Sequence, residues 1–149
     1  MAELYIENEI TVNVSPERLW EVLTSADWTP KYMFGCRTVS DWQVGSKLEW
    51  RMVHEGQDMA VVTGNLKVIE PHKQLVYTVF DPFGGFEDVP ENHLDVEYHL
   101  TPVAGGTHFR VRQGDFNTVA EGERRYKDSN ADGLGWQPLL EQIKAVAEG

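Results

Sequence analysis

A chain of 149 residues with a formal net charge of -11 and a pI near 4.8 is one domain long and strongly acidic. Phosphate backbones and anionic lipid surfaces repel such a chain, which argues against nucleic acid or a membrane as partner. We expect a single domain over residues 1–149, without a bilayer-spanning run or a signal peptide. The single cysteine, Cys36, excludes an internal disulfide and favours a reducing, cytoplasmic location.

The first third of the sequence predicts one strand and two short helices. Residues 6–14 alternate loosely between apolar and polar, which is typical of a strand. A helix is expected to follow, with Ser15 as its N-cap and Pro16 at its first position, where the missing N–H costs nothing. A second short helix is expected over residues 29–34, since a proline lies in its first turn and Gly35 follows it.

Residues 47–55 and 58–69 are predicted to form a hairpin. Gly56-Gln57 would be its two-residue turn, because glycine can take the positive φ that a type II′ turn needs. The pairs expected on the apolar face are Trp50 with Thr63, Met52 with Val61 and His54 with Met59. A further strand is expected to contain residues 75–79.

A second hairpin is predicted around a turn at residues 102–105, with Leu100 opposite Thr107. In this register apolar pairs fall on one face and oppositely charged pairs on the other. The apolar pairs are Tyr98 with Phe109 and Val96 with Val111, and the charged pairs are Glu97 with Arg110 and Asp95 with Arg112.

The last part of the chain predicts one amphipathic helix that begins near Asp132 or Gly133. Its apolar residues recur at the spacing of one buried helical stripe. They are Trp136, Leu139, Leu140, Ile143, Val146 and Ala147. A stripe this broad must pack against the apolar face of a sheet. The sequence therefore predicts an α+β fold, in which a curved antiparallel sheet of about seven strands wraps around a long C-terminal helix.

Several short motifs occur here in the order in which one known family carries them. Residues 15–24 read S-P-E-R-L-W-E-V-L-T, and residues 40–46 read S-D-W-Q-V-G-S. Weaker matches are Gly64, Leu75-Val76-Tyr77-Thr78, Gly105-Gly106-Thr107 and Gly135-Trp136. With these motifs the chain resembles the heat-shock protein 90 ATPase activator homologue family of the START-like (SRPBCC) superfamily. The eukaryotic activators carry a further N-terminal domain with an N-x-N-N-W-H-W motif, and nothing in this sequence resembles that motif. The resemblance is therefore to single-domain, bacterial-type members.

The resemblance implies a helix-grip fold with a cavity between the sheet and the C-terminal helix. We expect this cavity to bind a small hydrophobic molecule, because aromatic and methionine side chains supply adaptable apolar area and a few polar groups set orientation. The residues predicted to bind it are Trp50, Met52, His54, Tyr77, Tyr98, Gln113, Trp136 and Leu140. For the polar members the alternative is structural: they would be satisfied by each other or by water.

The sequence assigns no catalytic residue, metal or cofactor. It contains no Ser-His-Asp order, no H-x-x-E-H, no G-x-G-x-x-G and no P-loop. Cys36 is expected to be a structural thiol. His99 and His108 are expected to face each other on the outer face without a carboxylate, which is too few ligands for a metal. Residues 81–92 are expected to form a solvated acidic loop whose Phe83 and Phe86 can fold over a cavity.

Three functions remain open. Binding of a hydrophobic small molecule is the leading hypothesis. The second is a protein-interaction, co-chaperone-like module whose partner is a chaperone or another protein. The third is an enzyme of the cyclase or hydratase type, which rests on fold analogy alone. A fully packed interior would favour the second, whereas a cavity of several hundred cubic ångströms would favour the first or the third.

Overall fold

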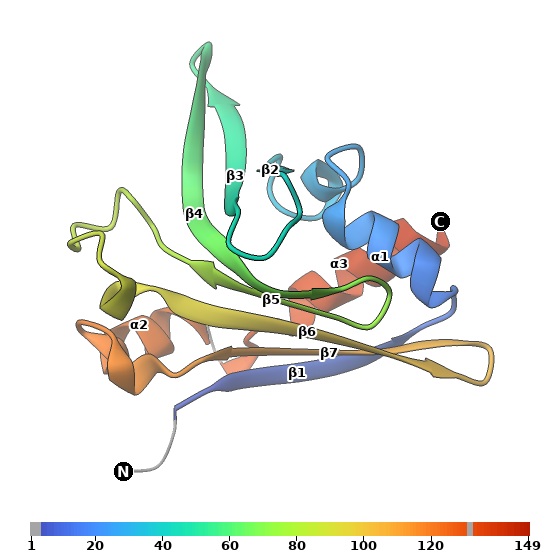
Figure 1. Cartoon of the computed structure of the whole chain (residues 1–149). Helices are drawn as coiled ribbons and strands as arrows, with labels where there is room; N and C mark the ends of the chain where they lie inside the picture. The colour runs from blue at the N-terminus through green and yellow to red at the C-terminus, as the bar shows by residue number, and fades with distance from the viewer. Residues whose placement is uncertain (1–3, 131–132) are drawn as a thin grey trace.

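One antiparallel sheet dominates the computed structural model, which describes residues 4–130 and 133–149 (Figure 1). Within these residues it has seven strands in the order β1-β7-β6-β5-β4-β3-β2. The strands are β1 (Ile6–Val12), β2 (Arg37–Ser40), β3 (Lys47–His54), β4 (Gln57–Glu70), β5 (Gln74–Val79), β6 (Leu94–Val103) and β7 (Gly106–Gly114). The predicted α+β class and helix-grip arrangement are confirmed.

Two helices pack over the apolar face of this sheet and close the core. They are α1 (Pro16–Thr24) and α3 (Gln137–Glu148), which contact each other, and α3 also runs beside β1. Their buried residues join the inward residues of β5, β6 and β7 in one apolar cluster. The chain also forms a third helix, α2 (Gly122–Ser129), and the short 3-10 turns η1 (Thr29–Lys31), η2 (Pro90–Asn92) and η3 (Phe116–Thr118). None of the described helices has the length and hydropathy needed to cross a membrane.

The helix predicted after the first strand forms as expected, but the second one does not. Ser15 Oγ accepts a hydrogen bond from the Arg18 N–H at 3.2 Å, and Pro16 begins α1. The expected helix over residues 29–34 shrinks to the three-residue turn η1. Phe34 and Gly35 both have positive φ, 52° and 84°, and a right-handed helix cannot continue through such residues.

The β3–β4 hairpin has a different turn from the predicted one. Glu55 and Gly56 occupy the turn, with φ of 50° and 78°, as a type I′ turn requires. The predicted Gly56-Gln57 turn is therefore wrong, and the pairing shifts by two residues at Met52 and His54 and by one at Trp50. The observed pairs are Trp50 with Val62, Met52 with Met59 and His54 with Gln57, with an irregularity after Trp50.

The β6–β7 hairpin turns one residue later than predicted, which shifts every cross-strand partner by two residues. Val103 pairs with Gly106, so Ala104 and Gly105 form the turn. The observed pairs are Leu100 with Phe109, Tyr98 with Val111, Val96 with Gln113, Glu97 with Arg112 and Asp95 with Gly114. The predicted partners are thus wrong, but a two-residue shift keeps every side chain on its predicted face.

The charged pairs on the outer face of this hairpin change accordingly. Arg112 lies 3.6 Å from Glu97, and Arg110 lies 3.6 Å from Glu7 of β1. Asp95 is bound at 2.9 Å by Lys67 of β4. These half-exposed ion pairs contribute little to stability, so the apolar face sets the register.

The C-terminal helix starts later than predicted. α3 begins at Gln137, Gly133 lies outside it, and Asp132 lies outside the described residues. The helix α2 was not predicted from the sequence. Its only buried residue is Gly122, where an added Cβ would lie 1.6 Å from the Phe116 carbonyl oxygen. The Tyr126 ring packs edge-on against Phe116 at 5.5 Å and holds α2 beside the sheet.

Candidate ligand cavity

An apolar cavity of about 440 Å³ lies between the sheet and the start of α3. Strands β3, β4, β5, β6 and β7 form its walls, the loop before β2 forms its rim, and α3 closes one end. Its lining residues are Met33, Phe34, Cys36, Trp50, Met52, Val61, Val62, Tyr77, Val79, Val96, Gln113, Trp136 and Leu139. A cavity of this size and composition is typical of a binding site for a small, mostly apolar molecule.

Five of the eight residues predicted to bind a ligand line this cavity. They are Trp50, Met52, Tyr77, Gln113 and Trp136. Tyr98 lies behind the wall and is 1% exposed, and Leu140 is fully buried in the core, whereas its neighbour Leu139 reaches the cavity. The inward orientation expected for His54 is wrong, because His54 lies at the tip of the β3–β4 hairpin, opposite Gln57, with 64% of its side chain exposed.

The two buried tyrosines satisfy each other. Their hydroxyl oxygens lie 2.7 Å apart, and their rings meet edge-on at 5.4 Å. Burial raises the pKa of Tyr77 and of Tyr98, so both phenols stay protonated and neutral. The structural alternative is therefore confirmed for this pair. Tyr77 presents its ring to the cavity, and its hydroxyl group is held in the wall.

Gln113 fixes the orientation of the tryptophan that closes the cavity. The Trp136 indole N–H donates to Gln113 Oε1 at 2.9 Å, and the Trp136 backbone N–H donates to Asn8 Oδ1 at 2.9 Å. The Trp136 ring also meets Tyr98 edge-on at 6.1 Å. The indole is thus held by Gln113 and Tyr98 and the backbone by Asn8, which makes this end of the cavity preformed.

The rim of the cavity combines an exposed aromatic ring with a buried thiol. Phe34 is 80% exposed although it lines the cavity. Cys36 is 6% exposed, and burial raises the pKa of its thiol, which keeps it protonated. A protonated thiol is a weak nucleophile, in agreement with the structural role predicted for Cys36.

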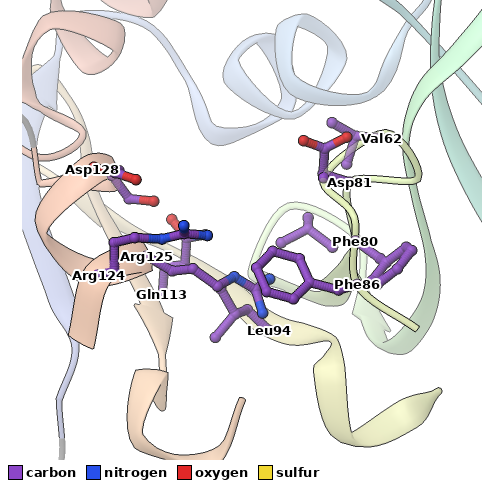
Figure 2. Close-up of a pocket in the computed structure, with 12 residues that line it drawn as sticks. Val62, Phe80, Asp81, Phe86, Leu94, Gln113, Arg124, Arg125 and Asp128 are labelled. Carbon is purple, nitrogen blue, oxygen red and sulfur yellow. The ribbon is translucent and has the colours of Figure 1, made fainter. Parts of the chain in front are cut away.

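A second pocket of about 420 Å³ adjoins the apolar cavity and is more polar (Figure 2). Its apolar side consists of Phe80, Phe86 and Leu94, and α2 contributes Arg124, Arg125 and Asp128. The Arg125 guanidinium lies over the Phe86 ring, 4.6 Å from its centroid. Of the two loop phenylalanines, Phe86 therefore folds over a pocket, whereas Phe83 is 65% exposed.

The outer-face histidines do not face each other as predicted. His99 lies opposite Arg110, and His108 lies opposite Thr101. Each has a glutamate nearby, with His99 Nε2 3.1 Å from Glu97 and His108 Nε2 3.6 Å from Glu9. Among the described residues no group of three or more His, Cys, Asp or Glu side chains is placed to hold a metal ion.

Two parts of the site were not predicted from the sequence. The rim residues Met33 and Phe34 lie in an irregular segment whose path depends on the positive φ of Phe34. The arginines of α2 lie in the run G-E-R-R-Y-K-D-S, which has no apolar stripe to indicate a helix. The adjacent arginine pair was the only available signal, and alone it is typical of a solvated surface.

Comparison with known proteins agrees with the geometry. A model of the "Activator of Hsp90 ATPase homolog 1-like protein" family matches residues 13–148. The solution structure of ChR145 from Cytophaga hutchinsonii is 28% identical, with a TM-score of 0.74 over 99% of this chain and 97% of that one. No curated protein matches the chain.

Two more distant structures share the fold. The Aha1 dimer from Colwellia psychrerythraea is 17% identical, with a TM-score of 0.68 over 99% of this chain and 97% of that one. A protein from Mesorhizobium loti is 21% identical, with a TM-score of 0.71 over 97% of this chain and 96% of that one. At these identities the likeness is one of architecture.

Proposed function

Because this chain belongs to the Activator of Hsp90 ATPase homolog 1-like family and its sheet leaves an apolar cavity against α3, we propose that it binds a small hydrophobic molecule there. The single observation that carries the proposal is the cavity of about 440 Å³, walled by Trp50, Met52, Tyr77 and Trp136. These large side chains leave open space between the sheet and α3 instead of filling it, as a ligand site requires.

The contacts around the cavity support binding in a preformed site. The polar groups of Tyr77 and Trp136 are already hydrogen-bonded within the wall, so they need no partner from a ligand. A ligand would displace water from rings and methionine side chains, which gives favourable burial of apolar area. Met33 and Met52, which both line the cavity, can adapt to its shape.

Filling the cavity tests the proposal. We expect Met52→Trp to abolish binding of the neutral fluorescent probe N-phenyl-1-naphthylamine, which should bind the unmodified protein in the micromolar range, about -8 kcal/mol. Val53→Trp is the matched control, because Val53 is the next residue of β3 and its side chain is 64% exposed. Fluorescence titration of the three proteins measures binding, and circular dichroism measures folding.

Two outcomes would contradict the proposal. Unchanged binding by Met52→Trp would place the probe elsewhere. Unfolding of Met52→Trp, with Val53→Trp intact, would show that the site has no room for a ligand, since overpacking a filled core destabilises it.

A protein-interaction role is the second candidate. The β3–β4 hairpin extends beyond the rest of the sheet (Figure 1) and exposes Val53, while Phe34 is exposed beside the cavity rim. The matched family is named for an activator of the Hsp90 ATPase, and one relative of the same fold was solved as a dimer. A chaperone or another protein is the partner under this proposal, and the buried free thiol of Cys36 is compatible with a cytoplasmic location.

A further inference from the structure

The apolar cavity and the second pocket lie next to each other and share part of their lining. Val62, Val79 and Gln113 line both of them. A molecule that occupies the apolar cavity and passes Gln113 therefore reaches the side chains of α2. The chemistry of that second pocket then sets which polar group such a molecule can carry.

Arg125 is the cation of this pocket that lacks a charged partner. Within the part of the chain that the structure describes, no carboxylate lies within ion-pair distance of its guanidinium, whereas the neighbouring Arg124 is 3.3 Å from Glu121. The Arg125 nitrogens reach only the carbonyl oxygens of Ala120 and Asn92, at 3.5 and 3.4 Å. Burial lowers the pKa of Arg125, and the nearby charges of Asp81 and Glu121 oppose this shift only in part, so an anion in contact with the guanidinium would offset the remaining desolvation.

Gln113 offers a second donor at the junction of the two pockets. Its Oε1 accepts the Trp136 indole N–H, so the amide orientation is fixed and the amide NH₂ group is the end left for a ligand. Guanidinium and amide NH₂ groups are both donors. A group that only accepts hydrogen bonds is therefore the complementary partner.

Two carboxylates also line the second pocket, and their negative charge would repel an anionic ligand. Asp81 and Asp128 are both exposed, and they lie on opposite sides of the pocket in Figure 2. Asp81 already accepts the Phe83 N–H at 2.8 Å. Exposed carboxylates are well solvated and screened, whereas Arg125 is half-buried, so the arginine dominates at the inner end of the pocket.

We propose that the bound molecule is amphipathic, with its apolar body in the cavity and an acidic group, such as a carboxylate or sulfonate, at Arg125 and Gln113. The inference rests on the proposed function and adds the chemical class of the ligand. It also explains why a strongly acidic protein keeps, beside an apolar cavity, an arginine that makes no ion pair with the described residues.

A matched pair of fluorescent probes tests this inference. 1-Anilinonaphthalene-8-sulfonate carries the rings of N-phenyl-1-naphthylamine plus one sulfonate. We expect Arg125→Gln to weaken sulfonate binding about tenfold or more, the worth of a charge-assisted hydrogen bond, and to change binding of the neutral probe less than about twofold. Arg125→Lys keeps the charge and should retain part of the sulfonate affinity. Lys127→Gln, on the same helix but paired with Glu123, should leave both affinities unchanged.

The outcomes separate this inference from the proposed function. If the neutral probe binds but Arg125→Gln leaves sulfonate binding unchanged, the proposed ligand cavity is supported and the proposed binding of an acidic group at Arg125 is wrong. An equal loss in Lys127→Gln would show a diffuse charge effect and would also overturn it. Tighter binding of the neutral probe than of the sulfonate would show that repulsion by Asp81 and Asp128 outweighs attraction by Arg125, and it would overturn the inference. Binding of neither probe would overturn both proposals.

Discussion

Leu140→Ala is expected to lower the free energy of unfolding by about 2–5 kcal/mol, as truncation of a fully buried leucine does. Leu140 is completely buried, in the cluster that joins α3 to α1 and the sheet. Alanine has the highest helix propensity, so the loss would report packing and not helix formation. Urea unfolding measures it.

Leu134→Ala is the matched control, because Leu134 precedes α3 and is 52% exposed. It should cost less than about 0.5 kcal/mol, as surface substitutions usually do. A loss of similarly small size for Leu140→Ala would contradict the account, since it would mean that α3 does not close the core.

Gly64→Ala is expected to destabilise the protein by about 3 kcal/mol or more, because it forces two strands apart. A Cβ added at Gly64 would lie 1.7 Å from the Thr78 carbonyl oxygen, a backbone atom of the neighbouring strand β5. Neither strand can shift freely, since β4 also pairs with β3 and β5 also pairs with β6. Thermal and urea unfolding measure the effect.

Gly84→Ala serves as its control. Gly84 has no positive φ, and its nearest neighbours, at 3.3 Å, belong to the side chains of Asp81 and Phe86, which can move. We expect a cost below about 1 kcal/mol. Equal losses for the two variants would show that the close approach of β4 to β5 is not the cause.

The hydrophobic pattern predicted which face of the sheet is buried, and the structure confirms this part of the prediction. At the β6–β7 hairpin the predicted partners were wrong by two residues, but side chains alternate with a period of two. Tyr98 and Gln113 therefore still point to the apolar face. The cavity-lining residues Trp50 and Tyr77 were found for the same reason, since β-strand alternation does not depend on exact partners.

The predictions failed where the local backbone conformation, and not the hydrophobic pattern, determines the structure. Whether Glu55 adopts positive φ decides the β3–β4 turn, and a type I′ turn instead of type II′ moved His54 to the exposed tip. Helix α2 has almost no buried surface of its own, so periodicity could not indicate it. Without α2 the second pocket, and with it Arg125, could not be predicted.

The tryptophans of the chain can report directly whether a ligand binds between the sheet and α3. Of its five tryptophans, Trp50 and Trp136 line the apolar cavity, whereas Trp20, Trp28 and Trp42 lie outside that lining. Titration with N-phenyl-1-naphthylamine, followed through the indole N–H resonances by heteronuclear NMR, should shift the signals of Trp50 and Trp136 and leave the other three in place. Shifts confined to Trp20, Trp28 or Trp42, or no shift at saturating probe, would contradict a ligand site between the sheet and α3.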